Sequence, residues 1–507
     1  MIRSVGLEGM KGYVVYVEAD VRLEKEQCVI VGLPDASMKE SKERILSNLH
    51  LLQLDLTLKK ITIHLSPSDK RKMGVGYDCA MLLAVLNKTL DKPLPIDEHT
   101  CVLGSLTLNG EIVPFHGLIP SLQQALQLGF KRILIPPIDT SFLQLNDEIE
   151  LVPLATVQQM LDYLNGQCTL AMAKLSLVKQ PRQEIFQTTT TDFKMIHGHK
   201  RAKRALEIAA AGGHHVLLSG PPGCGKSMLA DAFHTIFPDM TNDEMLEVYS
   251  IYHLAKEEAS FSHRPTYRAP HHSSSATSLI GGGTYPKPGE ISLAHRGVLF
   301  LDELGEFSKK ALDMLRQPLE KGEVSISRVR QTVTYPAAFT LIAATNPCPC
   351  GYFGSNERYC TCTPQQVKTY QQKASGPLLD RIDFFLSLKS VGIHQQTKGE
   401  SSEMIRERTT KAREMQKQRY GNKYLNGTAP VQLILEACSL NDLQNQRIKE
   451  ICYRQKWSNR TQIKLLRIAR TIADLQCSKA IEDVHLQEAI DWKMETIHEV
   501  AEGVHHG

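Results

Sequence analysis

A loop rich in glycine and proline, residues 220–225, most constrains what this chain can fold into. A short apolar run, 216–218, precedes the loop, and Lys226 and Ser227 follow it. An apolar run bounded by turn residues is typical of a buried strand in a parallel sheet. Two glycines that frame four positions before Lys and Ser match the phosphate-binding P-loop pattern. The pattern predicts a strand, a loop that wraps a polyphosphate, and a helix over 227–236.

The residue types of this loop suit contact with phosphates. Backbone N–H groups reach phosphate oxygens where side chains are small, and the positive end of the following helix adds favourable charge. Lys226 would reach the β- and γ-phosphates, and Ser227 would ligate Mg²⁺. The expected ATP-binding set here is Gly220, Pro221, Pro222, Gly223, Cys224, Gly225, Lys226, Ser227 and Met228.

A second apolar run, 297–303, ends in two acids, Asp302 and Glu303. Asp302 would hold Mg²⁺ through water, and Glu303 would act as general base toward the attacking water. A strand with a solvated acidic end is the alternative for this run taken alone. Together with the phosphate loop, it predicts an enzyme that hydrolyses ATP with Mg²⁺.

Length and composition limit the classes to which the chain can belong. A chain of 507 residues exceeds one hydrophobic core, so we expect several domains. It has no long apolar run and no apolar core of a signal peptide near its N-terminus, so we expect a cytoplasmic protein without a membrane span. Its twelve cysteines are then thiols or metal ligands. A net charge of +4 is too small to indicate nucleic acid by itself.

Residues 1–165 mix strand and helix patterns and predict an α+β domain. Alternating or β-branched runs indicate strands, and longer amphipathic runs indicate helices. We expect strands over 13–18, 27–32, 60–65, 111–113 and 132–135, and helices over 39–51, 80–86 and 120–129.

Short segments of this region carry a resemblance to a known family. Residues 31–36, 40–44, 103–111 and 117–118 resemble the N-terminal domain of the ComM/YifB magnesium-chelatase-like family, a domain similar to the proteolytic domain of Lon.

Lon-type proteases use a Ser–Lys dyad, and this chain lacks both members. It has Gly76 within the segment 74–78, which contains no serine, and Ile119 where the lysine would align. Asp78 has no activation scheme that would let it replace a serine hydroxyl. We therefore expect no protease activity and an accessory role in assembly or DNA handling.

The resemblance extends over nearly the whole chain and implies its domain plan. We expect a multidomain α/β protein with a Lon-protease-like α+β domain over 1–165 and a linker over 166–190. An AAA+ P-loop ATPase core with a parallel sheet would follow over 191–390, and a helical lid over 391–507. The threonines at 188–191 could instead form a short edge strand.

The start of the motor region resembles the base-binding entry of AAA+ ATPases. The resemblance implies that the backbone near Ile196 and His197 contacts adenine. Two histidines as close as His197 and His199 could instead suggest a metal, although ordinary packing explains them as well.

The most distinctive stretch comprises 268–275 and 281–295, and it resembles the magnesium-chelatase subgroup of AAA+ proteins. In that subgroup a β-hairpin insertion points toward the pore of a ring. Lys287 lies in this insertion and is expected to contact DNA. His271 and His272 could be read as zinc ligands, but no partner ligands lie at a suitable spacing.

A second hairpin is predicted from 324–330 and 332–337. Its alternating pattern places Arg328 and Arg330 on one strand face. The resemblance to pore-threading helicases implies that both arginines contact DNA phosphates. The alternative is a solvated hairpin face.

The strand over 339–346 ends at Asn346, which resembles the sensor 1 residue that hydrogen-bonds the γ-phosphate or the attacking water. Two close cysteine pairs follow. Four thiolates can form a closed, structural zinc site, although a single residue between paired cysteines is tighter than usual. Free thiols or a redox pair are the alternatives. The four residues are Cys348, Cys350, Cys360 and Cys362.

The segment 376–383 resembles the arginine-finger segment of chelatase-like AAA+ proteins. Arg381 would then reach the ATP site of a neighbouring subunit and stabilise charge on the transferred phosphoryl group. This implies a homo-oligomeric ring. A local ion pair of Arg381 with Asp380 or Asp383 is the alternative.

The helical lid is expected to fold over the nucleotide. A helix over 460–475 resembles the sensor 2 helix of the family, with Arg460 as the matching residue and Arg467 as the fallback. The expected helices of the motor and lid are 201–211, 308–320 with Ser308 as N-cap, 403–420, 431–454, 460–475 and 481–490.

The resemblance implies a hexameric, ATP-driven DNA helicase that promotes branch migration of recombination intermediates in natural transformation. Its partners would be single-stranded and branched DNA, including DNA bound to a recombinase, and no membrane. A metal-chelatase motor and a non-translocating ATPase scaffold are the alternatives.

Overall fold

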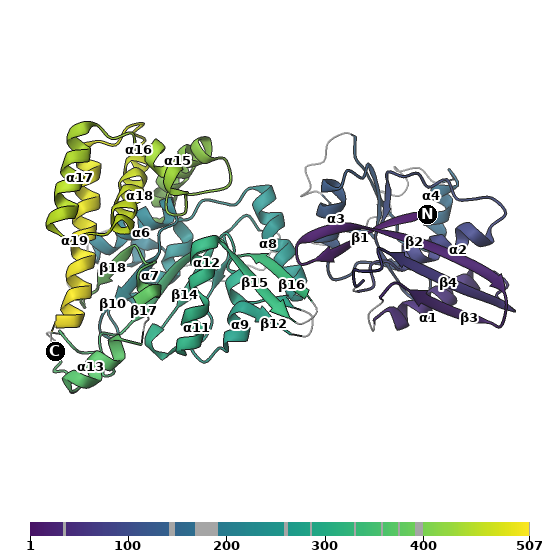
Figure 1. The fold of residues 1–507 in the computed structure, drawn as a ribbon, viewed down its shortest axis with the longest axis horizontal. Helices are drawn as coiled ribbons and strands as arrows, with labels where there is room; N and C mark the ends of the chain where they lie inside the picture. The colour runs from purple at the N-terminus through teal and green to yellow at the C-terminus, as the bar shows by residue number, and fades with distance from the viewer. Residues whose placement is uncertain are drawn as a thin grey trace. The chain divides into compact units, whose positions relative to one another are not determined.

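The computed structural model describes residues 1–507 except 34–36, 73, 141–147, 168–190, 258–261, 284–285, 329–330, 356–357, 374–375, 391–398 and 506–507. The chain forms two compact units, which comprise 1–185 with 242–261, and 186–241 with 262–507 (Figure 1). Most of the predicted linker, with three of the four threonines at 188–191, lies outside the described residues.

The first unit is built on a four-stranded sheet in the order β1-β2-β4-β3 and a three-stranded parallel sheet in the order β5-β8-β9. The mixture of strands and helices matches the expected α+β character. Its elements are β1 (Ile2–Glu8), β2 (Lys11–Leu23), β3 (Gln27–Val31), α1 (Ser37–Leu51), β4 (Lys59–Ser66), α2 (Asp78–Thr89), β5 (Thr100–Val102), β6 (Ser105–Leu106), β7 (Ile112–Val113), α3 (Leu118–Gln127), β8 (Arg132–Ile135), β9 (Glu150–Pro153), α4 (Val157–Leu164) and α8 (Asn242–Ala255).

Helix α8 belongs to the first unit although its sequence interrupts the motor region. It packs on α3, where Ser250 Oγ donates to Gln123 Oε1 at 2.7 Å. The backbone N–H of Gly117 donates to His253 Nδ1 at 2.8 Å. The sequence pattern alone did not anticipate this exchange, because a helix's packing partner is not encoded in its own periodicity.

The second unit is built on a five-stranded sheet in the order β11-β14-β17-β10-β18, in which every neighbouring pair is parallel. This confirms the expected parallel sheet. Its helices and sheet share one hydrophobic core, in which Phe384 of the sheet and Ile468 of the C-terminal helices are both fully buried. The predicted lid is therefore part of the same compact unit as the motor.

The elements of the second unit, up to the sheet's last strand, are η1 (Phe193–Met195), α6 (Lys200–Gly212), β10 (Val216–Ser219), α7 (Lys226–Phe233), η2 (His234–Ile236), β11 (Tyr267–Arg268), α9 (Ala276–Ile280), β12 (Gly281–Gly282), β13 (Lys287–Pro288), α10 (Glu290–Leu293), β14 (Val298–Leu301), η3 (Leu304–Glu306), α11 (Lys309–Met314), α12 (Arg316–Lys321), β15 (Glu323–Arg328), β16 (Gln331–Pro336), β17 (Thr340–Thr345), α13 (Pro364–Gln371), α14 (Gly376–Leu379) and β18 (Phe384–Ser387). The C-terminal helices are α15 (Ser402–Tyr420), α16 (Val431–Cys438), α17 (Asp442–Arg454), α18 (Asn459–Leu475) and α19 (Asp483–His505).

Two helices that were predicted as continuous are each divided in two. The expected helix 308–320 is divided into α11, which ends at Met314, and α12. The break occurs because Pro318 has no N–H and its ring clashes with the carbonyl four residues earlier. The expected helix 431–454 breaks at Ser439, which has a φ of 35°, and Asn441 caps the second half. The predicted N-cap Ser308 is confirmed, since its side chain accepts from Ala311 N–H.

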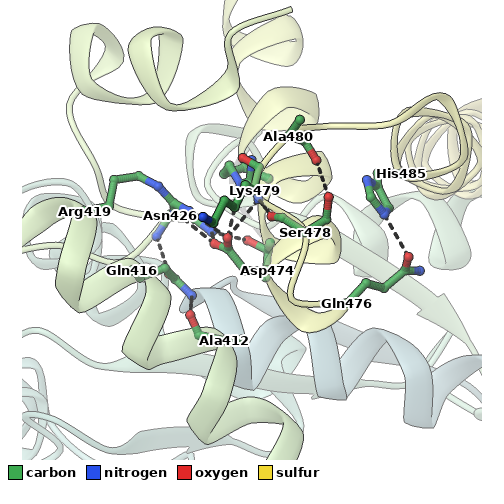
Figure 2. A network of polar contacts seen from close by, with 12 residues as sticks. Ala412, Gln416, Arg419, Asn426, Asp474, Gln476, Ser478, Lys479, Ala480 and His485 are labelled. Atoms are coloured by element: carbon green, nitrogen blue, oxygen red, sulfur yellow. Dashed lines mark hydrogen bonds and ion pairs between the residues drawn. The ribbon is translucent and has the colours of Figure 1, made fainter.

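A buried polar network ties α15 to α18 (Figure 2). Asp474 accepts from Arg419 at 2.7 Å and from Arg470 at 3.0 Å, and Asn426 Nδ2 donates to it at 2.8 Å. Arg470 and Asp474 have no exposed surface. A buried carboxylate that two guanidinium groups and an amide satisfy holds the helices in a single arrangement.

Across the described parts of the chain, no helix is both long and apolar enough to cross a membrane.

Candidate active site

The phosphate loop joins β10 to α7, as the sequence predicts. Gly223 and Gly225 adopt φ values of 79° and 92°, a left-handed conformation that side chains disfavour. Lys226 Nζ donates to the carbonyls of Gly220 and Pro221, at 2.7 and 3.0 Å. Burial lowers the pKa of Lys226, while the charges of Cys224, Asp302 and Glu303 oppose that shift. The loop is therefore folded around its own lysine.

The order of the strands brings the predicted catalytic residues to one edge of the sheet. Strand β17 lies between β10 and β14, and all three run parallel, so their carboxyl ends meet. Lys226 Nζ lies 3.1 Å from Asn346 Oδ1. Ser227 Oγ donates to Asp302 Oδ2 at 3.2 Å. Two oxygen donors this close fit a Mg²⁺ ion, which prefers carboxylate and hydroxyl oxygens.

Glu303 follows Asp302 and has an unusual backbone conformation. Its φ and ψ are 50° and 51°, in the left-handed region that non-glycine residues rarely adopt. Its carboxylate lies near an imidazole, with Glu303 Oε2 3.2 Å from His272 Nδ1. The sequence singled out His272 only as a doubtful zinc ligand. Its position just after β11, the strand beside β14, is the signal that could have placed it next to Glu303.

The residues expected to contact adenine, Ile196 and His197, precede α6. Ile196 is buried, and its carbonyl accepts from Lys203 Nζ at 2.5 Å. His197 is exposed. Its neighbour His199 interacts with the backbone of Cys224, and burial lowers the pKa of its ring. His199 therefore touches the phosphate loop directly, which sequence reasoning missed.

The four predicted cysteine ligands come together. All four Sγ atoms lie within 4.8 Å of one another, and in the described part of the chain they form the only such group of three or more His, Cys, Asp or Glu side chains. Cys348 Sγ lies 3.3 Å from Cys350 Sγ and 3.7 Å from Cys360 Sγ. The cysteine loop also touches the nucleotide site, because a Cβ added to Gly351 would lie 2.7 Å from Pro222 Cδ.

Arg381 and Arg460 lie away from the phosphate loop of their own chain. Val216 pairs with Phe384 and Ser219 with Ser387, so Arg381 precedes the amino end of β18, whereas the phosphate loop leaves the carboxyl end of β10. These two ends of the paired strands are about 10 Å apart.

Both arginines meet one carboxylate, Glu320. Arg381 Nη2 lies 2.5 Å and Arg460 Nη2 lies 2.9 Å from its Oε1 atom. The alternative for Arg381 was a local ion pair with Asp380 or Asp383. Arg381 does form an ion pair, but its partner is Glu320. Arg460 lies in the first turn of α18, and in the next turn Lys464 Nζ donates to Ile382 O at 2.7 Å, just before β18.

The two predicted DNA-contacting hairpins pack on one another. Tyr335 Oη in β16 donates to Pro286 O at 2.7 Å. Gly282 pairs with Lys287 across β12 and β13, and a Cβ on Gly282 would lie 2.9 Å from Arg328 Nη2. Lys287 and Arg328, both exposed, are therefore brought together. Arg330 lies outside the described residues.

In the first unit, Asp78 is fully buried. Arg44 Nε donates to it at 2.7 Å, and Leu106 N–H at 3.2 Å. Burial raises the pKa of this carboxyl, while Arg44 and Ser41 oppose the shift. Ile119 is buried as well. Because its carboxylate is buried and hydrogen-bonded, Asp78 has a structural role in the first unit.

Comparison with known proteins identifies the family. Models described as "Magnesium chelatase, subunit ChlI", "Subunit ChlI of Mg-chelatase" and "Magnesium chelatase, subunit ChlI C-terminal" match residues 192–396, 17–139 and 399–493. The competence protein ComM of Haemophilus influenzae is 38% identical over 495 residues, which cover 96% of this chain and 95% of that protein. The chain belongs to the ComM/YifB family of magnesium-chelatase-like proteins.

Other relatives agree with this assignment. The uncharacterized protein YifB of Escherichia coli is 38% identical over 497 residues, 96% of this chain and 95% of that protein. An archaeal Lon protease of Methanocaldococcus jannaschii is 29% identical over 106 residues, 21% of this chain and 16% of that protein. Membership in the ComM/YifB family confirms the resemblance, and this AAA+ type of family suggests ATPase activity with ATP and Mg²⁺.

Proposed function

We propose that this chain is a ring-forming, ATP-driven DNA helicase that promotes branch migration of recombination intermediates during natural transformation. The observation that carries the proposal is the separation of two halves of an ATP site. The phosphate loop, Asp302 and Asn346 meet at one edge of the sheet, whereas Arg381 lies at the opposite edge. A second copy of the chain is therefore needed to complete each site, which favours a ring such as a hexamer.

The residues at the first edge can perform hydrolysis. Asp302 and Ser227 would hold Mg²⁺, Lys226 would bind the β- and γ-phosphates, and Asn346 would orient the water. The water oxygen forms a bond to the γ-phosphorus, and the bond to the β–γ bridging oxygen breaks. ADP keeps that electron pair, and the water proton passes to the Glu303 carboxylate. Arg381 of the neighbouring copy would stabilise charge on the transferred group.

Contact with DNA is supported by the paired hairpins. Lys287 pairs with Gly282, and Arg328 lies next to Gly282. Two exposed cations are therefore close together on the paired hairpins. Such cations bind phosphates without reading sequence. The Haemophilus influenzae relative is named a competence protein, which supports a role in natural transformation. The substrate would be single-stranded and branched DNA, bare or bound to a recombinase.

We propose zinc as a structural cofactor of the cysteine loop. A tetrahedron with Zn–S bonds of about 2.3 Å has sulfur–sulfur edges of about 3.8 Å. The separations of 3.3, 3.7 and 3.5 Å among Cys348, Cys350 and Cys360 are near that edge and far from the length of about 2.05 Å of a disulfide bond. Four protein ligands would close the site and leave no position for a substrate.

We also propose that the first unit is a Lon-like domain without proteolytic activity. Gly76 and Ile119 supply neither nucleophile nor base, and Asp78 is engaged by Arg44. Its place in the proposed ring would be assembly or DNA handling.

The proposal is tested by ATP turnover with and without single-stranded and branched DNA, in the wild type and in Lys226→Ala. We expect DNA to stimulate turnover and the variant to lose it. Unwinding of a labelled forked duplex, in the wild type and in Glu303→Gln, separates a helicase from a scaffold that only binds DNA. ATP turnover that is indifferent to every DNA tested would reject the helicase.

A metal-chelatase motor is the second candidate, because the matching family models are named for a magnesium-chelatase subunit. DNA-stimulated turnover would reject it, because a motor for metal insertion has no reason to respond to DNA.

A further inference from the structure

His272 makes the side-chain contact that this structure shows for the proposed general base. Its Nδ1 atom lies 3.2 Å from Glu303 Oε2, and the two side chains are 35% and 50% exposed. Glu303 begins a short 3₁₀ helix in the left-handed region, with φ and ψ of 50° and 51°. Its own N–H donates to Asp302 Oδ1 at 2.9 Å. The chain therefore leaves the extended conformation of β14 at Glu303, and the carboxylate of this residue lies against His272.

The imidazole is itself held in place. The rings of His271 and His272 lie against one another, tilted by 34°, with centroids 4.0 Å apart, and His271 Nδ1 lies 2.7 Å from Ser273 Oγ. Ser275, three residues after His272, caps α9, and its side chain accepts from Ser278 N–H at 3.0 Å. A ring that lies between a second imidazole and a capped helix can orient a carboxylate on a short, exposed turn.

The loop that carries His272 is closed at its base. Arg268, at the end of β11, donates to both carboxylate oxygens of Glu290, at 2.7 and 2.8 Å. Glu290 begins α10, directly after β13 and Lys287. A bidentate pair of this kind fixes orientation as well as distance. The segment between Arg268 and Glu290 is thus one stapled loop, with His272 near the ATP site and the hairpin residue Lys287 further along it.

We propose that His272 is a positioning residue that orients the Glu303 carboxylate for water activation, and that the stapled loop links this contact to the hairpin that carries Lys287. The positioning role rests on Glu303 as the general base of the proposed function. The link rests in addition on the proposed contact of Lys287 with DNA.

The contact of the His272 ring nitrogen with the Glu303 carboxylate is the feature to test. Asparagine can place its Nδ2 donor where His272 Nδ1 lies, whereas alanine removes the donor. A general base contributes about 10²- to 10⁴-fold to turnover, and a small misplacement removes a large part of such a contribution. We expect His272→Ala to lower kcat at least about tenfold with little change in the KM for ATP, and His272→Asn to retain most of the activity.

The experiment measures steady-state ATP turnover of the full chain, with and without single-stranded DNA, together with thermal melting. His271→Phe is the matched control, because it keeps a ring against His272 and leaves the contact between His272 and Glu303 in place. Unchanged kcat in His272→Ala would overturn the proposal, and so would an equal loss in His272→Asn or a loss that appears only as a raised KM. An unchanged melting temperature in His272→Ala separates loss of positioning from loss of folding.

Two further variants separate this proposal from the proposed function. If Glu303→Gln retains turnover, the assignment of the general base fails, and the role of His272 fails with it. If DNA does not stimulate the wild type, the helicase proposal fails, while the effect of His272→Ala on basal turnover still tests the positioning role. The link to the hairpin requires that Glu290→Gln, which weakens the pair with Arg268, lowers DNA stimulation but leaves basal turnover unchanged. Equal loss of both, or no loss of stimulation, would overturn the link.

Discussion

A buried histidine at the amino end of β10 should make the second unit sensitive to acid. His215 lies just before β10, and only 7% of its surface is exposed. Its Nδ1 accepts from the Leu341 N–H at 3.1 Å, so the neutral ring is the form that the fold satisfies. Burial lowers the pKa of His215 to about 4, although the nearby Asp383 charge opposes the shift. Protonation would both charge a buried ring and remove the acceptor.

The sign and size of the effect follow from linkage. The ordinary histidine pKa is 6.5 and the folded value is about 4, so the unfolded chain binds the proton first as the pH falls. Stability is therefore complete above about pH 6.5 and is lost progressively down to about pH 4. At about 1.36 kcal/mol for each pKa unit, the total loss is about 3 kcal/mol, of which about 2 kcal/mol has occurred at pH 5.

The assay is urea unfolding followed by tryptophan fluorescence at pH 7.5 and pH 5. Both tryptophans, Trp457 and Trp492, belong to the second unit, so the signal follows the unit that contains His215. The free energy of unfolding of the wild type should fall more between these pH values than that of His215→Asn, by about 2 kcal/mol. Asparagine retains an acceptor for Leu341 N–H but does not titrate. His197→Asn, at an exposed ring, is the control, and equal pH dependence in the wild type and His215→Asn would refute the reasoning.

Three other predictions follow from named contacts. Arg381→Ala should lower kcat about 10³-fold while ATP binding is kept, and mixing it with Lys226→Ala should restore turnover because each chain supplies the half that the other lacks; mixtures that stay inactive would contradict a shared site. Asp474→Asn should lower the free energy of unfolding, measured in urea, by about 3–5 kcal/mol. The reason is that it leaves Arg470 and Arg419 without their buried carboxylate. A loss below about 1 kcal/mol would show that the network does not hold the helices. Cys360→Ser should abolish the zinc content measured by atomic emission. It should also lower ATP turnover, because the cysteine loop touches Pro222. Cys477→Ser, at an exposed thiol, is the control, and zinc-free wild-type protein with full turnover would argue against the metal.

The nucleotide-binding half of the site was predictable because its signals are local. The glycines at 223 and 225 mark positions where the backbone turns left-handed, and apolar runs before Lys226 and Glu303 predict buried strands. Each signal occupies about ten consecutive residues or fewer, a scale on which propensity and turn chemistry act. The cysteines within each pair were readable for the same reason, because one residue separates them, whereas the meeting of the two pairs depends on how the intervening segment folds back.

The other contacts depended on long-range pairing that no local pattern encodes. His272 meets Glu303 because β11 lies beside β14, and Arg381 shares Glu320 with Arg460 because the start of α18 contacts the segment before β18. The motif at Arg381 indicated a role but not a location.

The sequence by itself determined the chemistry of this protein: the phosphate loop, the acids after the second strand, and the set of cysteines. Only the tertiary structure decided which residues lie together, such as His272 with Glu303 and helix α8 with the first unit. The physical reason is that backbone conformation is selected by neighbours within a few residues, whereas the order of strands and the packing of helices are selected by the burial of apolar surface contributed from the whole chain.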